Sequence, residues 1–268
     1  MKTMGINHRG GLALIRGTWA SWLQYRSFFF LLAFAWMIQP LLSLFIWSAA
    51  AGEGSLGGID RAGFITYYLL VIFVNQVTYA QANYTLGDVI RSGGITTWLL
   101  RPVPALYHVF SSEVAGKVVY TLFTVPVVLL LGLVLKPDLS LKASSLPGFV
   151  LALALAWALR NFWGIWLALL AFWSTRADAL LTVQDSLVFL LSGVLAPVAL
   201  LPGAMQTAAR WLPFHAMIGF PVEVMMGHLT PAETVQGFAF QVGWLAVSLA
   251  LTRVMWNRGV RRYSAVGG

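Results

Sequence analysis

The sequence predicts an all-α, polytopic membrane protein with six transmembrane helices, an N-terminal interfacial helix and a broken re-entrant element before the last helix. Hydrophobic residues make up 59% of the 268 residues and charged residues only 10%, whereas soluble domains carry about 25% charged residues. The mean hydropathy is +0.78, and the apolar residues fall into blocks of about 20 residues, the length that crosses a bilayer. We expect a single transmembrane domain over residues 1–268.

The N-terminal segment, residues 9–26, has the periodicity of an amphipathic helix. Leu12, Ile15 and Trp19 recur at three- and four-residue spacing, and the basic residues, such as Arg16, lie largely elsewhere on the helical wheel. Such a helix lies on the membrane surface with its tryptophans at headgroup level. The alternative is that the segment begins the first span. We expect no removable signal peptide, because the segment lacks a compact apolar core followed by a small-residue cleavage site.

Six apolar segments are long enough to be spanning helices. We place them at residues 27–50, 64–84, 108–135, 148–173, 180–201 and 234–256. The Gln39-Pro40 pair predicts a kink in the first span, because proline has no N–H to donate within a helix. The second span carries Asn75 and Gln76, more polarity than lipid tolerates, so this face is expected to point into the helix bundle.

Lysine and arginine are unevenly distributed between the two sides of the membrane. Twelve fall on the side of both termini, namely Lys2, Arg9, Arg16, Arg26, Arg91, Arg101, Lys117, Arg176, Arg253, Arg258, Arg261 and Arg262. Four fall on the other side, namely Arg61, Lys136, Lys142 and Arg210. Cytoplasmic loops carry the basic excess, so we expect both termini in the cytoplasm. The net charge of +8 is then a feature of membrane topology, and we expect lipid but no nucleic acid as a partner.

The segment over residues 192–232 is apolar, yet it cannot form one continuous spanning helix. Pro197, Pro202 and Pro213 each remove a backbone donor, and the pieces between prolines are about ten residues long, half of what a span needs. Such pieces dip into the membrane and return, with their non-helical backbone buried in protein or lining a wet cavity. Glu223 lies in this segment as a gate or substrate contact or, alternatively, as a solvated loop residue.

The order of Gly193, Pro197, Leu201-Pro202 and Leu212-Pro213-Phe214 resembles the element before the last helix of type-2 ABC exporter permeases. The close match is confined to residues 192–214, and the rest of the chain fits the family in length, span count and loop placement. The resemblance implies a multi-pass protein of the bacterial inner (plasma) membrane. It also implies pairing with a second permease, identical or a sister chain, and with two copies of an ATP-binding subunit.

The chain contains no P-loop, the G-x-x-x-x-G-K-[ST] motif that cradles nucleotide phosphates. The nearest candidate, Gly116-Lys117, is followed by Val118 and has Ser111 in place of the first glycine. If ATP drives the process, ATP and Mg²⁺ are bound by the partner subunit, and this chain needs no cofactor of its own. The sequence has no cysteine, and its four histidines show no metal-ligand spacing. We therefore expect no metal.

The longest loop on the side of the termini, residues 85–107, is predicted to contain two short helices. Leu86–Arg91 can form the first, Gly93-Gly94 interrupts it, and Ile95–Leu100 can form the second before Arg101-Pro102 ends it. The loop position and its Leu-Leu-Arg-Pro ending resemble the coupling helix of the same family. The resemblance implies that the ATPase is contacted by Asp88, Arg91, Ile95, Trp98, Leu99 and Arg101. The alternative is an ordinary loop that rests on lipid headgroups.

Arg160 is the most costly residue to place in a membrane, at about 2.5–3.5 kcal/mol near the centre of a span. With Asn161, Asn75 and Gln76 it forms our candidate for the translocation path, in which it would meet an anionic group of the substrate. The alternatives are that Arg160 has a structural partner, or that its span is offset so that its guanidinium reaches the interface.

The candidate structural partners of Arg160 are the carboxylates of Asp185 and Glu223. Trp157 and Trp163 lie three residues to either side of it and can cover the guanidinium through cation–π contact.

Three functions compete for this sequence. The favoured one is the permease subunit of an ATP-driven ABC exporter for an amphipathic substrate, whether lipid, lipid-linked glycan, peptide or drug, with ATP hydrolysis in a separate subunit. A stand-alone secondary transporter or channel predicts matching halves and several buried ionisable residues, and the sequence shows neither. A membrane enzyme needs a catalytic cluster of charged residues, and we find none in the sequence.

Overall fold

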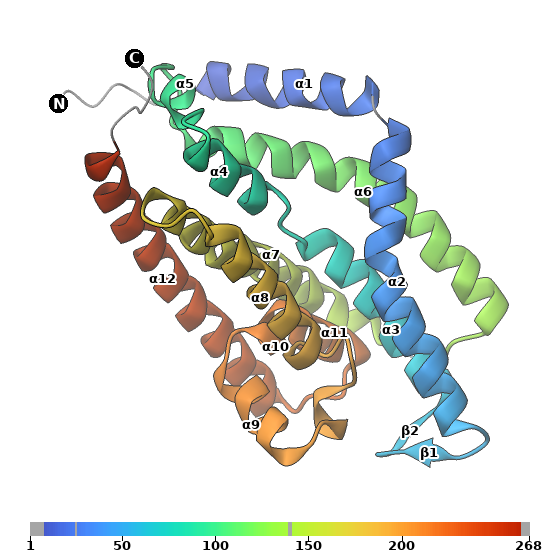
Figure 1. The fold of residues 1–268 in the computed structure, drawn as a ribbon. Helices are drawn as coiled ribbons and strands as arrows, with labels where there is room; N and C mark the ends of the chain where they lie inside the picture. Colours follow the sequence, from blue (N-terminus) through green and yellow to red (C-terminus); the bar gives the residue numbers. More distant parts are fainter. Residues whose placement is uncertain (1–7, 25, 139–140, 264–268) are drawn as a thin grey trace.

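The computed structural model describes residues 8–24, 26–138 and 141–263 (Figure 1). The long helices are α1 (His8–Gln24), α2 (Arg26–Ala51), α3 (Arg61–Thr78), α6 (Leu106–Leu135), α7 (Leu146–Ala168) and α12 (Pro231–Arg262). The shorter ones are α4 (Ala82–Arg91), α5 (Ile95–Leu99), α8 (Ala177–Leu191), α9 (Gly203–Trp211), α10 (Phe214–Met217) and α11 (Gly219–Met226). The predicted all-α class is confirmed, and the strands described are two of two residues each, β1 (Ser55–Leu56) and β2 (Ile59–Asp60).

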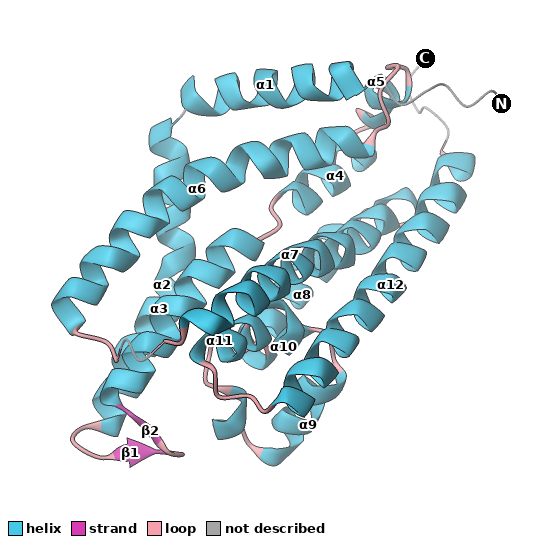
Figure 2. Cartoon of the chain, turned by 180° about the vertical axis from the view of Figure 1, so that it is seen from behind, coloured by secondary structure: helices cyan, strands magenta, loops and turns pink. Residues whose placement is uncertain are grey.

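The helices form two packed groups that share α3. On one side α2, α3 and α6 pack against one another, and on the other α7 packs along α12 and also contacts α3, α4, α8 and α11. The start of α1, α5 and the end of α12 lie at one end of the molecule, which we call the terminal end. The β1–β2 hairpin and α9 lie at the opposite end, the hairpin end (Figures 1 and 2).

Within the described residues, five helical stretches are long and apolar enough to cross a membrane, namely Phe30–Ala51, Arg61–Arg91, Leu106–Leu135, Ala143–Phe172 and Pro231–Arg262. The predicted fifth span, residues 180–201, is α-helical only in α8 (Ala177–Leu191), which has 15 residues. At about 1.5 Å per residue α8 is shorter than the hydrocarbon core of a bilayer. Five candidate spans are therefore found where the sequence predicts six.

The predicted second span is interrupted. Helix α3 ends at Thr78 and α4 begins at Ala82, and the three residues between them form a visible loop in Figures 1 and 2. The two short helices expected in the next loop are present as α4 and α5, although α4 starts four residues earlier than predicted. Helix α4 packs against α6, α7 and α8, so one side of the first predicted loop helix, with Leu86, Gly87 and Ile90, is buried inside the bundle.

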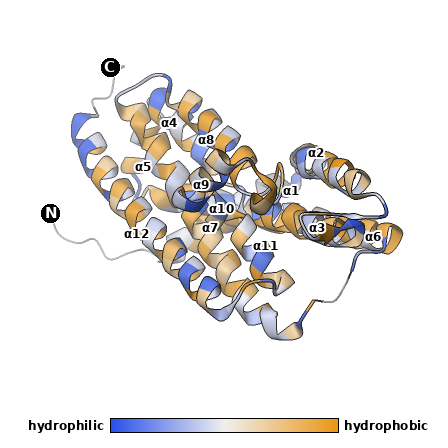
Figure 3. Cartoon of the chain, turned by 90° about the horizontal axis from the view of Figure 1, so that it is seen from below, coloured by the Kyte–Doolittle hydropathy of each residue, from blue (hydrophilic) through white to orange (hydrophobic). Residues whose placement is uncertain are grey.

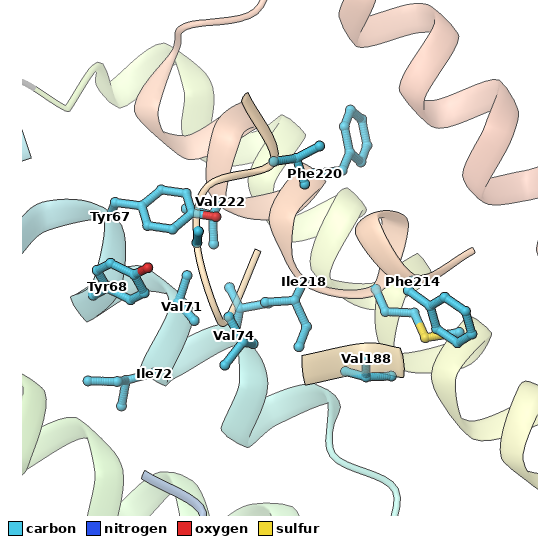
Figure 4. Close-up of a cluster of buried hydrophobic side chains, with 14 of the residues drawn as sticks. Tyr67, Tyr68, Val71, Ile72, Val74, Val188, Phe214, Ile218, Phe220 and Val222 are labelled. Carbon is cyan, nitrogen blue, oxygen red and sulfur yellow. The ribbon is translucent and has the colours of Figure 1, made fainter. Parts of the chain in front are cut away.

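The segment before α12 is broken into short helices by its prolines. Pro202 and Pro213 immediately precede α9 and α10, and Pro197 precedes the 3₁₀ turn Val198–Leu200. Helices α10 and α11 pack against α3, α7 and α8 through a core that includes Tyr67, Val188 and Ile218 (Figure 4). Whether this segment enters a membrane stays a prediction; most residues of 192–198 and 213–224 are buried in protein, whereas most of α9 is not.

Helix α1 lies across the terminal end and packs along α6 rather than continuing α2 (Figure 1). Leu12 is 58% exposed, as expected for an amphipathic helix on a membrane surface. Apolar residues dominate α2 and α6, whereas hydrophilic residues gather at the C-terminal end of α12 (Figure 3). Lys2 lies outside the described residues, and the structure does not describe the side chains of Arg9, Trp22, Leu23 and Arg26.

Candidate functional site

Arg160 lies on α7 and is 3% exposed. Its Nη1 donates hydrogen bonds to Asn75 Oδ1 at 2.8 Å and to Thr78 Oγ1 at 3.1 Å, both on the last turn of α3. The guanidinium lies 5.2 Å from the centre of the Tyr79 ring, a cation–π distance. The last turn of a helix favours a cation, because its carbonyl groups point outward there without partners. Arg160 is thus held by neutral oxygens and an aromatic ring.

The structural partners predicted for Arg160 are wrong. Glu223 is bonded to His215 instead, with 3.0 Å between Glu223 Oε1 and His215 Nε2. Asp185 accepts a hydrogen bond from the Tyr84 hydroxyl at 2.8 Å, and within the described part of the chain it forms no ion pair with Arg160. The tryptophans predicted to cover the guanidinium pack elsewhere, Trp157 against Phe110 and Trp163 against Trp166.

A cavity of about 370 Å³, the Arg160 cavity, brings the polar residues of four helices together. Its lining comprises Ala35, Trp36, Ile38 and Gln39 of α2, Asn75 and Tyr79 at the end of α3, Arg160 of α7, and Asp185, Val188, Phe189 and Val194 on or just after α8. Of the four predicted path residues, Asn75 and Arg160 line this cavity. Gln76 and Asn161 are buried, and they do not line it.

The residues predicted to contact an ATPase divide between a buried and an exposed group. Ile95 is 0% exposed, so its predicted contact is wrong and it anchors α5 instead. Trp98 is half-buried and stacks on His108 with 4.7 Å between ring centres. Asp88, Arg91, Leu99 and Arg101 are exposed, and we call the exposed residues Leu99, Leu100 and Arg101 the α5 tip. Sequence analysis did not single out Leu100, although it is 81% exposed.

Polar contacts attach the end of α4, the turn at residues 92–94 and α5 to the rest of the terminal end. Arg91 forms ion pairs with Asp88 and with Asp178 of α8, the latter at 3.2 Å. Tyr263, next to the end of α12, donates a hydrogen bond to the Gly93 carbonyl at 2.9 Å and lies 2.8 Å from Thr96 Oγ1. A displacement of α5 would therefore be felt by both α8 and α12.

Sequence analysis also missed Glu113 and Lys117, an ion pair inside α6 with 3.2 Å between Lys117 Nζ and Glu113 Oε2. Lys117 was assigned to the loops when basic residues were used to predict orientation. Because Lys117 lies inside a span, as Arg253 does within the predicted sixth span, neither is a loop residue, and ten basic residues remain on the side of the termini against four. The signal that sequence analysis could have used is their four-residue spacing in an otherwise apolar helix.

At the hairpin end, His215 and Glu223 line a second cavity of about 440 Å³ between α10, α11 and α12. Burial alone would lower the pKa of His215, but the charge of Glu223 and the hydrogen bond to it outweigh burial and raise that pKa above its usual value. Pro197 and Pro213 are buried, and Pro202 is exposed. Glu223 is therefore a paired residue and not a solvated loop residue.

Comparison with known families decides the class of this protein. A family profile described as "ABC-2 family transporter protein" matches residues 34–267, most of the chain. The chain belongs to this family. As an ABC-2 permease it is the membrane component of a transporter, a class that is generally not catalytic itself and that associates in general with an ATPase subunit. Comparisons with curated proteins and with solved structures gave no match.

Proposed function

We propose that this permease is the membrane half of an ATP-driven exporter in the bacterial inner membrane. It works as a pair, with a second copy or a sister chain, and is driven by two copies of a separate subunit that binds ATP and Mg²⁺ and hydrolyses the ATP. Family membership, the missing P-loop motif and the basic excess at the terminal end support this arrangement. Both termini then lie in the cytoplasm.

The observation that carries the proposal is the α5 tip. Leu99 and Leu100 expose apolar side chains beside Arg101, on the end of the molecule that carries most of the basic residues. A short apolar helix edged by a cation suits a groove on a partner subunit. The attachments of α5 to α8 and α12 supply a route by which movement of that partner reaches the transmembrane helices.

The test is purification of the tagged permease from mild detergent, followed by mass spectrometry and an ATPase assay of the eluate. We expect an ATP-binding subunit to co-purify with the wild type. The double variant Leu99→Asp/Leu100→Asp should remain inserted but retain about tenfold less of that subunit, because buried charge is costly at an apolar contact. Ser174→Asp, an exposed position at the same end, is the control.

Unchanged co-purification in the double variant would exclude the α5 tip as the docking surface. A wild-type permease that purifies alone and without ATPase activity would favour the stand-alone transporter or channel instead.

We further propose that the translocation path passes the Arg160 cavity and accepts an amphipathic substrate. Trp36, Tyr79 and Phe189 supply aromatic surface there, and Arg160 supplies a positive charge without an ion-pair partner among the described residues. Lipids, lipid-linked glycans, peptides and drugs all fit this chemistry. An anionic group on the substrate would bind the guanidinium in a medium where charge–charge attraction is strong.

Arg160→Leu and Arg160→Lys test this path. If Arg160 contacts the substrate, Arg160→Leu folds and binds the ATPase subunit, but a panel of amphiphiles no longer stimulates ATP hydrolysis, whereas Arg160→Lys retains part of the response. A variant that is absent from the membrane or elutes as an aggregate would support a structural role. A stimulation profile that matches the wild type would exclude Arg160 from the path.

A further inference from the structure

The break between α3 and α4 contains Tyr79, Ala80 and Gln81, and neither proline nor glycine. Sharp interruptions without those residues arise where side chains insert into the backbone hydrogen-bond ladder. Two charged side chains of α6 take that role here. Glu113 Oε1 accepts a hydrogen bond from the Ala82 N–H at 2.6 Å, and Lys117 Nζ donates to the Tyr79 carbonyl. Helix α6 therefore satisfies the backbone groups that the break exposes.

The signs of the two charges fit the two helix ends. Glu113 lies at the N-terminus of α4, where the helix dipole favours an anion, and Lys117 lies at the C-terminus of α3, where it favours a cation. The Tyr120 hydroxyl adds a third contact by donating to Gln81 Oε1 at 2.7 Å. Glu113 is 3% exposed and Lys117 is 16% exposed. A buried pair of this kind adds little net stability over apolar side chains of similar size, so stability alone does not account for the pair.

The break separates two regions that transport must connect. On one side, the last turn of α3 holds Arg160 through Asn75 and Thr78. On the other side, α4 leads through the turn at residues 92–94 to α5 and its exposed tip, and the Tyr263 hydroxyl contacts both the Gly93 carbonyl in this turn and Thr96 of α5. If α4 moves relative to α3, the bend must occur at Tyr79–Gln81, because α3 and α4 are regular helices on either side.

We propose that residues 79–81 are a hinge and that Glu113 and Lys117 are positioning residues, which hold its two helix ends so that movement of α5 displaces Arg160. The proposal rests on the proposed function in that the ATPase subunit supplies the movement. The pair acts by its placement against α3 and α4, and not merely as a four-residue ion pair that stabilises α6.

A variant in which the two charges are exchanged distinguishes these two roles. The double variant Glu113→Lys/Lys117→Glu restores an ion pair within α6, but it places a cation at the start of α4 and an anion at the end of α3. If the pair serves only α6, the swap regains the function that each single change loses. If the pair holds the hinge, the swap fails, because both charges now oppose the helix dipoles and leave the Tyr79 carbonyl without a donor.

The first measurement uses the permease alone in lipid nanodiscs. The chain has no cysteine, so spin labels at Arg61→Cys on α3 and Thr85→Cys, an exposed position on α4, report the distance across the hinge. We expect Lys117→Met and the swap to widen this distance distribution at least about twofold relative to the wild type. The control variant is Lys142→Met, an exposed lysine, and the control label pair is Arg61→Cys with Val134→Cys, which joins the hairpin ends of α3 and α6.

The second measurement uses the complex with its ATPase subunit, in nucleotide-free and vanadate-trapped states. We expect the distance across the hinge to change between states while the control pair does not. Lys117→Met and Glu113→Gln should lower the stimulation of ATP hydrolysis by a panel of amphiphiles about fivefold, and Lys117→Arg should keep most of it. If Lys117→Met fails to fold, Glu113→Gln, Lys117→Arg and the change in the wild-type hinge distance between the two states still test the proposal.

A distribution in Lys117→Met or in the swap as narrow as that of the wild type would overturn the proposal, as would full coupling in the swap. So would a wild-type hinge distance that stays fixed on trapping. If no ATPase subunit co-purifies, the proposed function fails, but the width measured on the permease alone still decides whether these residues hold a hinge.

Discussion

The molecule contains two interrupted helical regions that are broken by different means. The segment over residues 192–230 is broken by its own backbone, with Pro202 and Pro213 before short helices and Gly193 at a φ of +100°. The break at residues 79–81 has no such residue, and side chains of α6 hold it. One interruption is encoded locally and the other by a distant helix.

This difference separates a fixed shape from an adjustable one. Proline fixes its own φ and has no N–H to donate, and glycine accepts a positive φ without strain, so the bends of the proline-rich segment depend on residues at the bends themselves. The break at residues 79–81 depends on contacts with Glu113 and Lys117, and contacts can be rearranged when α6 or α4 moves. The adjustable break lies between the α5 tip and Arg160, where a transporter needs movement.

The largest effect is expected from breaking the contact-held interruption with Glu113→Ala. The change leaves Lys117 buried without its counter-charge and the Ala82 N–H without its acceptor. Removing one partner of a buried ion pair costs about 3–5 kcal/mol. We expect the free energy of unfolding, measured by SDS titration of the detergent-solubilised permease, to fall by this amount. Glu53→Ala, an exposed carboxylate near the β hairpin, is the control, and an equal cost in both variants would mean that Glu113 does not hold the break.

The next effect tests the backbone-held interruption through Gly193→Ala. At a φ of +100° a side chain strains the backbone, and a Cβ here would collide with the Tyr67 hydroxyl, which donates a hydrogen bond to the Gly193 carbonyl at 3.0 Å. Backbone strain and a lost buried hydrogen bond together cost about 2–4 kcal/mol. The same SDS titration measures it.

Gly243→Ala serves as the control for that experiment, because nothing lies within 4 Å of a Cβ at position 243 in the middle of α12. We expect the control to be neutral or slightly stabilising, since alanine favours a helix more than glycine does. Equal stability of the two alanine variants would contradict a backbone-held break at Gly193.

The same comparison explains what the sequence could predict. The interruption around Pro197, Pro202 and Pro213 was predictable because the breaking residues lie at the break itself. The interruption at Tyr79–Gln81 was not, because its cause lies more than thirty residues away at Glu113. The apolar helices α2 and α6 follow from hydropathy alone, as does the α5 helix from its flanking glycines and prolines.

The candidate site was predictable in its residues but not in its contacts. Arg160 and Asn75 stood out as polar groups in apolar spans, and they meet in one cavity. The partners of Arg160 were mispredicted because charge pairing favours a carboxylate, whereas the end of α3 supplies neutral acceptors and a helix dipole. Ile95 was mispredicted as exposed because a five-residue helix has too little periodicity to show which face is buried.

A smaller effect separates charge from backbone within the proline-rich segment. His215 has a raised pKa, so its bond to Glu223 contributes stability in full below the unfolded pKa of about 6.5, and this contribution is lost as the pH rises through the folded pKa. As the pH rises through the folded pKa, we expect the thermal midpoint of the wild type to fall by about 2–4 °C, which corresponds to a loss of about 1 kcal/mol in the free energy of unfolding.

Glu223→Gln should remove most of that pH dependence, and His228→Gln, which changes an exposed histidine in the same part of the chain, should leave it intact. A wild-type midpoint that is flat across this pH range would mean that the bends of the segment are held by proline and glycine alone.

The smallest effect is expected from Pro202→Ala, which tests whether this proline acts only by restricting the backbone. Pro202 is exposed and has a φ of −56° and a ψ of 146°, which alanine adopts without strain. The native structure therefore loses no contact, and the variant gains conformational freedom only in its unfolded state. Such changes cost about 0.4–1 kcal/mol, measurable in the same SDS titration. A loss of stability as large as that of Gly193→Ala would show that Pro202 acts through packing. The proline-rich segment would then be held by contacts, as the break at residues 79–81 is, and not by its backbone alone.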